Sequence, residues 1–363
     1  RRLVPPRGAG DTERGIRDMV KGFNAEGMTA VKDPGVSPSA WDSYKKVQAD
    51  NALNVRVFAL WLGGRSVEGA KRLIEQRAAT TRPYESTGDD HLISGGIKLY
   101  IDGSGGARTA WLYDDWNRDF TGVDKGNHGY PSSAPDTIRL LIRMFHDAGM
   151  HVSVHSIGDQ GIDWVMDSYD QAMRENPKKG LRHGIIHSNI PSDHAIDLMA
   201  KLQHTFDAGY PEPSATFTWW LGDTYAGNFG ATRSARLNPF ATFKSKGILW
   251  ANGSDFGVTP FAARYGIWSA IAREPLLGVY GGDPFGRKES VDAKTALRAV
   301  TVWAARQLFL ETKIGSVEVG KYADLAIWDR DFYTVPTAQI KDAKCLMTIF
   351  NGKIVYQAAG VTF

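Results

Sequence analysis

The sequence predicts an α/β fold: a (β/α)8 barrel of the TIM type with a small β-sandwich appendage. Short β-rich runs alternate with helix-periodic segments over the first two thirds of the chain, and polar residues recur where those runs end. Such alternation is typical of parallel βαβ units, and barrels of this type collect functional residues at the carboxyl ends of several strands. After about residue 290 the pattern changes to one helix and glycine-bounded β-rich runs, which predicts the appendage.

The elements of the barrel are expected in chain order. Residues 11–27 form a predicted helix ahead of every strand candidate. Helical spacing of apolar residues predicts further helices over 136–148, 162–173 and 191–202. Seven β-rich runs are strand candidates: residues 28–35, 54–61, 96–104, 151–155, 184–190, 203–209 and 247–255. Because a closed barrel of this kind needs eight strands, we expect the first strand to lie upstream of residue 1.

Two domains are expected. Residues 1–305 would form the barrel, and residues 306–363 would form the C-terminal part of a sandwich assembled from both chain ends. The stretch 208–235, rich in Gly, Ala, Thr and aromatic residues, is expected to be a long loop over the site.

Composition excludes several classes of protein. The 363 residues are 42% hydrophobic and 23% charged, as in ordinary globular proteins. The net charge is +3 and the basic residues are scattered, so we expect no nucleic-acid partner. No apolar run is long enough to cross a membrane, and the single cysteine, Cys345, excludes a disulfide framework. The lack of a signal-peptide pattern favours the cytoplasm, and a homodimer is left open.

Two histidines end neighbouring strand candidates. In HVSVH (151–155), Val152 and Val154 would face the outer helices, so that His151, Ser153 and His155 face inward. His187 ends the next candidate in the same way. Each could be a hydrogen-bonded core histidine, but neighbouring parallel strand ends converge, and neutral imidazole is a common metal ligand.

Two charged residues extend this pair. Asp255 ends the last strand candidate and would either cap the following helix or take a proton from metal-bound water and return it to a leaving group. Lys98 lies in an apolar run, where a buried ammonium is costly. It would form a salt bridge to Asp102 or Asp255, or be a neutral amine whose carbamate bridges metal ions.

The order Lys98, His155, His187, Asp255 resembles the amidohydrolase superfamily. The stretches that carry the resemblance are GIKLYIDGSGGARTA, VSVHSIGDQGID, RHGIIHSNI, WANGSDFGVTP and GSVEVGKYADLAIWDRD with TIFNGKIVY. They are most similar to amidohydrolase family 3, the YtcJ-like and N-substituted formamide deformylase-like branch. The resemblance implies one or two divalent metal ions, with zinc expected, and a carbamate on Lys98 as bridging ligand. It also implies that His155 and His187 bind the second ion, and that Asp255 is both ligand and proton shuttle.

One motif of that family is missing. Its first barrel strand carries His-x-His, and no His-x-His occurs in this sequence. We expect a separate N-terminal fragment of the same protein to supply it. Without that fragment, three ligands and a water could still complete one tetrahedral zinc site.

The resemblance implies hydrolysis of a C–N bond, amide or formamide-like, in a small-molecule substrate. Weaker candidates for substrate contact are Arg108 and Thr109 after a glycine-rich corner, His204 and Asp207 after the seventh barrel strand, and Trp219 in the long loop; all could instead serve packing or turn formation. Two alternatives stay open. One is an inactive or regulatory homologue that binds a ligand or metal. The other is a metal-free acid–base barrel enzyme, for which only Asp102 and Asp207 could supply a second inward carboxylate.

Overall fold

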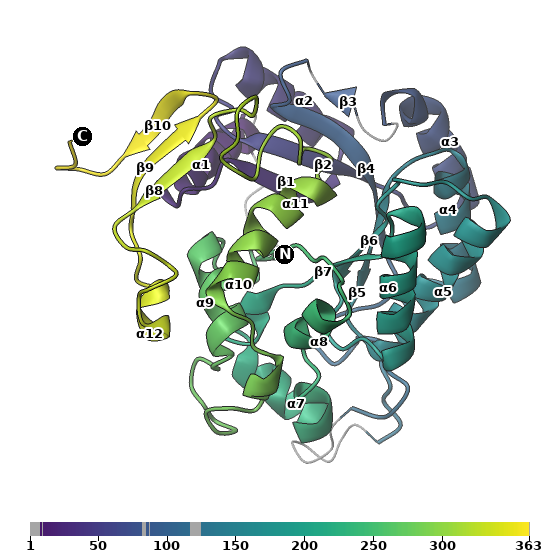
Figure 1. Ribbon diagram of the computed structural model, residues 1–363. Helices are drawn as coiled ribbons and strands as arrows, with labels where there is room; N and C mark the ends of the chain where they lie inside the picture. The colour runs from purple at the N-terminus through teal and green to yellow at the C-terminus, as the bar shows by residue number, and fades with distance from the viewer. Residues whose placement is uncertain (1–7, 9, 82–84, 87, 117–124, 363) are drawn as a thin grey trace.

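A curled parallel sheet wrapped by helices forms the larger part of the molecule (Figure 1). The computed structural model describes residues 8, 10–81, 85–86, 88–116 and 125–362. Six strands pair in the order β1-β2-β4-β5-β6-β7, all parallel. They are β1 (Ala30–Val36), β2 (Arg56–Leu62), β4 (Leu92–Tyr100), β5 (Val152–Ser156), β6 (Gly184–His187) and β7 (Tyr210–Glu212). A two-residue β3 (Glu85–Ser86) adds antiparallel to β4.

The predicted α/β barrel class is therefore confirmed, with six paired strands rather than eight among the described residues. The expected strand at 247–255 is extended but not a regular strand. It lies beside β7, because the amides of Ala251 and Gly253 donate to the carbonyls of Pro211 and Pro213. The expected strand at 203–209 is wrong. Helix α6 (Asp193–Phe206) continues through most of it, and β7 begins only at Tyr210.

Helices follow the strands as the βαβ pattern predicts. In chain order they are α1 (Asp11–Ala25), α2 (Pro38–Ala49), α3 (Val67–Arg77), α4 (Pro135–Asp147), α5 (Asp159–Glu175), α6, α7 (Gly222–Ser234), α8 (Phe240–Ser245), α9 (Ala263–Ala272), α10 (Ala293–Val300), α11 (Val302–Gln307) and α12 (Thr337–Ile340). The expectation of a long loop over 208–235 is wrong, because this region contains β7 and the whole of α7. Within the described part of the chain, no helix combines the length and apolar character needed to span a membrane.

Alternation along the strands divides the core into two layers. Val152 and Val154 are fully buried among apolar residues of the surrounding helices, as predicted. On the inner face, Phe58, Leu60 and Ile93 pack with apolar residues of the segment 308–314. This segment fills the barrel at the end opposite the carboxyl ends of the strands, so the polar residues gather at the other mouth.

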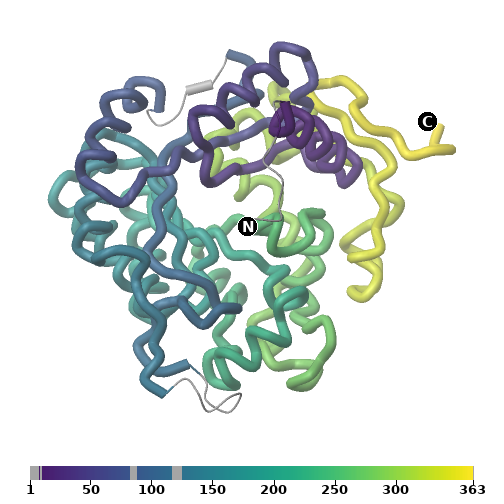
Figure 2. The backbone as a smooth tube through the Cα atoms, turned by 180° about the vertical axis from the view of Figure 1, so that it is seen from behind, coloured from purple at the N-terminus to yellow at the C-terminus, as the bar shows by residue number. Residues whose placement is uncertain are grey.

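The C-terminal appendage is a small antiparallel sheet, ordered β10-β9-β8. Its strands are β8 (Leu325–Trp328), β9 (Cys345–Phe350) and β10 (Lys353–Gln357). The N-terminal end contributes helix α1, which lies beside this sheet in both views (Figures 1 and 2). The Thr348 hydroxyl donates to the Asn24 carbonyl at the end of α1, and a buried Arg56–Asp324 ion pair (2.8 Å) ties the sheet to β2. The division at residue 305 stays a prediction.

Candidate functional site

Three of the four proposed ligand residues meet at the carboxyl ends of β4, β5 and β6. In the sheet register, Lys98 is opposite Ser153, Tyr100 is opposite His155, and Ser156 is opposite His187. The His155 and His187 rings lie edge to face with centroids 4.6 Å apart. Lys98 Nζ lies 4.6 Å from the centroid of the Tyr100 ring. Tyr100, which the sequence analysis did not single out, lies 5.3 Å from the His155 ring and is therefore part of the site.

Asp255 lies at the same mouth. It follows the extended segment beside β7 and has a left-handed backbone (φ 52°). The Asp255 side chain is accessible to solvent, but the protein around it partly desolvates the carboxyl and raises its pKa. The Lys98 charge opposes that shift. Burial, together with the Asp255 charge, raises the pKa of Tyr100. The helix-cap alternative is wrong, because α9 begins at Ala263 with Ala262 as its cap residue.

Lys98 is a buried amine, 3% exposed. Burial lowers its pKa to about 7, against the attraction of Glu212 and Asp255 and together with the repulsion of Lys32. No described residue forms a hydrogen bond or ion pair with its ammonium group, so the predicted salt bridge to Asp102 or Asp255 does not form. A substantial neutral fraction near neutral pH is the condition under which a lysine amine reacts with carbon dioxide.

Both imidazoles are held in the neutral state that metal ligands need. Burial lowers the pKa of His155 to about 3. Burial also lowers the pKa of His187, and a proton on that ring would in addition be repelled by any proton on His155 and by Lys98. His155 Nε2 donates to the Gly103 carbonyl (2.8 Å), which leaves Nδ1 with a lone pair. His187 Nδ1 is fully buried and has no hydrogen-bond partner among the described residues. An orphaned buried nitrogen is costly unless something binds it.

The backbone at the end of β6 is strained. His187 and Ser188 both have left-handed conformations (φ 76° and 43°), which non-glycine residues rarely adopt in succession. The Ser188 amide donates to the Ser156 carbonyl, and the Asn189 side chain bonds Asn238. Such strain persists only where neighbouring contacts enforce it, and it is common at functional sites.

A polar cluster below the site was missed by the sequence analysis. Lys32 Nζ on β1 donates to Glu212 Oε1 on β7 (2.8 Å) and to Ser153 Oγ (3.1 Å). Ser153 Oγ donates to the same Glu212 oxygen (2.7 Å). A Cβ at Gly184 would lie 2.0 Å from that oxygen, so only glycine leaves room for the carboxylate. The local signals were Lys32, a charged residue inside a β-rich run, and Ser153, which was expected to face inward.

The glycine-rich corner after β4 positions His155. The Thr109 hydroxyl accepts a hydrogen bond from the Ser104 amide (2.9 Å) and closes the turn that carries the Gly103 carbonyl. Arg108 belongs to the same turn and has a left-handed backbone. Asp102 accepts bonds from the amides of Trp111, Ile157 and Gly158, which joins the ends of β4 and β5. Burial raises its pKa to about 7, and these amides oppose the rise.

The remaining substrate-contact candidates are Trp219, His204 and Asp207. Trp219 packs against the Trp220, Tyr265 and Trp268 rings, with centroids 5.0–5.5 Å away. The expected placement of His204 and Asp207 after a strand is wrong. His204 lies on the exposed last turn of α6, and Asp207 precedes β7. Both are therefore at the opposite rim, where Asp207 pairs with Arg182 and Arg306.

The donor set of the site can be compared with what a metal ion needs. Nowhere in the described ranges do three or more His, Cys, Asp or Glu side chains converge to hold a metal by themselves. The histidine pair with its orphaned nitrogen supplies two nitrogen ligands, so a cation at this mouth requires Lys98, as a carbamate, or further oxygen ligands. The residues fit a metal site on this condition.

Comparison with known proteins decides the family. The profile of the amidohydrolase family matches residues 2–356. This chain belongs to the amidohydrolase family. The protein YtcJ of Bacillus subtilis (strain 168), named as an amidohydrolase, is 27% identical over 263 residues, which cover 72% of this chain and 47% of YtcJ. The N-substituted formamide deformylase of Arthrobacter pascens is 26% identical over 219 residues, covering 58% of this chain and 38% of that enzyme.

A solved structure supports the fold. A metal-dependent hydrolase of uncharacterized function from Pyrococcus horikoshii OT3 superposes with a TM-score of 0.74 at 20% identity, over 90% of this chain and 61% of that one. This chain therefore spans about half the length of the curated relatives and three fifths of that structure.

Proposed function

We propose that this amidohydrolase-family protein is a metal-dependent hydrolase that cleaves an amide or formamide-like C–N bond in a small molecule. The observation that carries the proposal is the pair of neutral imidazoles at adjoining strand ends, 4.6 Å apart, with a buried unbonded nitrogen on His187. Relatives named as a formamide deformylase and as a 5-methylthioadenosine/S-adenosylhomocysteine deaminase support C–N bond chemistry.

The proposed ligands of one or two divalent ions, with zinc favoured, are Lys98 as a carbamate, His155, His187 and Asp255. A divalent cation held there supplies Lewis-acid chemistry: it polarises a carbonyl and lowers the pKa of water. The Gly103 carbonyl fixes the tautomer of His155 by accepting its Nε2 proton, and Phe217, stacked 5.5 Å from His187, fixes the plane of the second ring. The protein thus holds the Nδ1 lone pair of His155 and the plane of the His187 ring in place before any ligand binds.

Asp255 is the proposed proton shuttle. Its raised pKa brings the carboxyl closer to the range in which it can accept a proton from the attacking water and return it to the departing nitrogen. A metal-free acid–base mechanism has less support. It needs a second free carboxyl, but Glu212 is paired with Lys32 and Asp102 is held by backbone amides.

Metal content and hydrolysis are measured together in the test. We expect the wild-type chain to hold about one equivalent or more of zinc-like metal, and His155→Ala with His187→Ala to lose it. The matched control is His194→Ala, which removes an exposed histidine paired with Asp167 and should keep the metal.

Release of amine from N-substituted formamides measures the hydrolysis, and it should stop when a chelator removes the metal. Bound metal without hydrolysis would favour the regulatory homologue, and hydrolysis without metal would favour the acid–base enzyme.

A further inference from the structure

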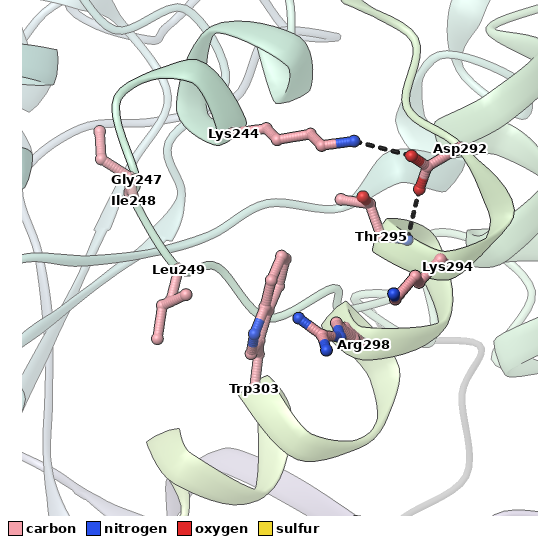
Figure 3. A pocket seen from close by; sticks show the side chains of 9 residues that line it. All are labelled: Lys244, Gly247, Ile248, Leu249, Asp292, Lys294, Thr295, Arg298 and Trp303. Carbon is pink, nitrogen blue, oxygen red and sulfur yellow. Dashed lines mark hydrogen bonds and ion pairs between the residues drawn. The ribbon is translucent and has the colours of Figure 1, made fainter.

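A hollow lies away from the candidate metal site. Its volume is about 410 Å³, within the range of roughly 300–1,000 Å³ typical of small-molecule sites. The hollow is lined by the end of α8, the segment Gly247–Leu249, helix α10 and Trp303 of α11 (Figure 3). Gly247–Leu249 leads into the extended segment whose other end carries Asp255, so the hollow lies at the opposite end of that segment from the proton shuttle.

The charge of this hollow is unbalanced. Three cationic side chains and one carboxylate line it: Lys244, Lys294, Arg298 and Asp292. Lys244 Nζ pairs with Asp292 (2.7 Å), which also caps α10 through the Thr295 amide. Lys294 and Arg298 are exposed, and no hydrogen bond or ion pair reaches either side chain from the part of the chain that the structure describes. Four residues apart on one helix, these like charges repel each other.

The facing wall is flat and apolar. Trp303 is half-buried and packs edge-on against the buried Trp250, with ring centroids 6.2 Å apart. Leu249 also lines the hollow, whereas the Ile248 side chain is 1% exposed and packs in the core. Figure 3 shows the Lys294 and Arg298 side chains on the side of α10 that faces the Trp303 ring. A ring on the tryptophan would therefore place an attached anionic group between the two cations.

We propose that this hollow binds a small organic anion: a planar ring stacked on Trp303 that carries a carboxylate or phosphate held by Lys294 and Arg298. Arginine binds either group in a bidentate manner, and lysine adds a point charge. The proposal is independent of the proposed hydrolysis, because no residue of the hollow belongs to the candidate metal site.

The test is isothermal titration calorimetry on the full chain after metal removal, at low salt. The probes are 2-naphthoate, 2-naphthyl phosphate, neutral 2-naphthol and inorganic phosphate. We expect one naphthyl anion to bind at least about tenfold more tightly than both naphthol and phosphate, and its identity distinguishes the carboxylate from the phosphate. The Lys294→Gln/Arg298→Gln variant should weaken that binding by about tenfold or more.

The matched control is Lys201→Gln/Lys246→Gln, which removes two surface charges paired with Asp170 and Asp197 outside the hollow. Its affinity should equal that of the wild type. Binding that survives Lys294→Gln/Arg298→Gln, or that disappears in His155→Ala, would place the probe elsewhere and overturn the proposal. Absence of binding by both naphthyl anions would overturn it as well. Trp303→Phe, which keeps a ring in the wall, should weaken the naphthyl anions without changing phosphate.

Discussion

Lys32 and Glu212 form an ion pair inside the barrel, with side chains only 15% and 10% exposed. Removing one partner leaves a poorly solvated charge, whereas the intact pair gains little over apolar residues. We predict that Lys32→Met lowers the free energy of unfolding by about 3–5 kcal/mol. Urea denaturation of the full chain, with the metal content held constant, measures the change.

The double variant Lys32→Met/Glu212→Gln should be more stable than Lys32→Met, because no charge is then left unpaired. The surface control is Lys45→Met, whose Asp42 partner is largely exposed, and whose effect should stay within about 0.5 kcal/mol. Equal effects of Lys32→Met and Lys45→Met would show that the interior pair has no special role.

At the scale of single elements, helix α9 ends on a buried arginine. Arg273 has a left-handed backbone (φ 52°), and its guanidinium donates to four carbonyls, those of Leu237, Asn238, Phe285 and Gly286. Burial lowers its pKa to about 10, so it stays charged at neutral pH. This one side chain therefore joins the turn after α7 to the loop after α9.

We predict that Arg273→Met lowers the free energy of unfolding by about 3–5 kcal/mol, because several buried carbonyls lose their donor. Arg273→Lys should keep little of the stability, since one ammonium cannot span two segments as the planar guanidinium does. Arg287→Met, which breaks only a half-exposed pair with Glu274, is the control. Thermal and urea unfolding measure all three, and a stable Arg273→Lys would contradict the role of the fork geometry.

The individual strands and helices show how much local sequence patterns can predict. Strands β1, β2, β4, β5 and β6 fall within or overlap the expected β-rich runs. All but β1 bury most of their residues, and β1 is only partly buried before Val36. Strand β7 has three residues, including Pro211, which is too short for periodicity to reveal. Helix α6, whose buried face ends at Met199 and Leu202, continues to Phe206 and so takes up the first four residues of the expected strand.

The residues of the site also differ in whether the sequence could predict them. His155, His187 and Asp255 could be found because each ends a β-rich run, and parallel strand ends meet at one mouth. The Lys32–Glu212 pair could not, because 180 residues separate its members and no local pattern reports a contact across the barrel. Whether the proposed ligands bind metal stays a prediction.

At the scale of the whole molecule, a chain of buried histidines joins α4, β5 and the start of β6. The Val152 amide donates to His183 Nδ1 (3.1 Å), so the ring proton is on Nε2, which donates to His146 Nδ1 (3.0 Å). His146 Nε2 donates to the Asn176 carbonyl (2.7 Å). Each ring nitrogen of His146 and His183 makes a hydrogen bond when both rings are neutral. A further proton on either ring would sit on a nitrogen that already accepts a hydrogen bond, and would point at that bond's donor. Burial lowers both pKa values, His183 well below the usual range.

These histidines predict how stability depends on pH. In the unfolded chain these histidines take up protons below about pH 6.5. In the folded chain burial lowers their pKa values, so they stay neutral to lower pH and the unfolded state binds more protons. The contribution of these histidines to the free energy of unfolding is therefore fully present above pH 6.5. It falls as the pH decreases, by up to about 1.4 kcal/mol per pH unit for each histidine.

His146→Leu should make this fall shallower in urea denaturation between pH 7 and 5. His194→Gln should have the opposite effect, because the hydrogen bond to Asp167 raises the pKa of His194, and its contribution, present at low pH, is lost as the pH rises. A wild-type stability that stays flat between pH 7 and 5 would show that the histidine chain can be protonated without unfolding.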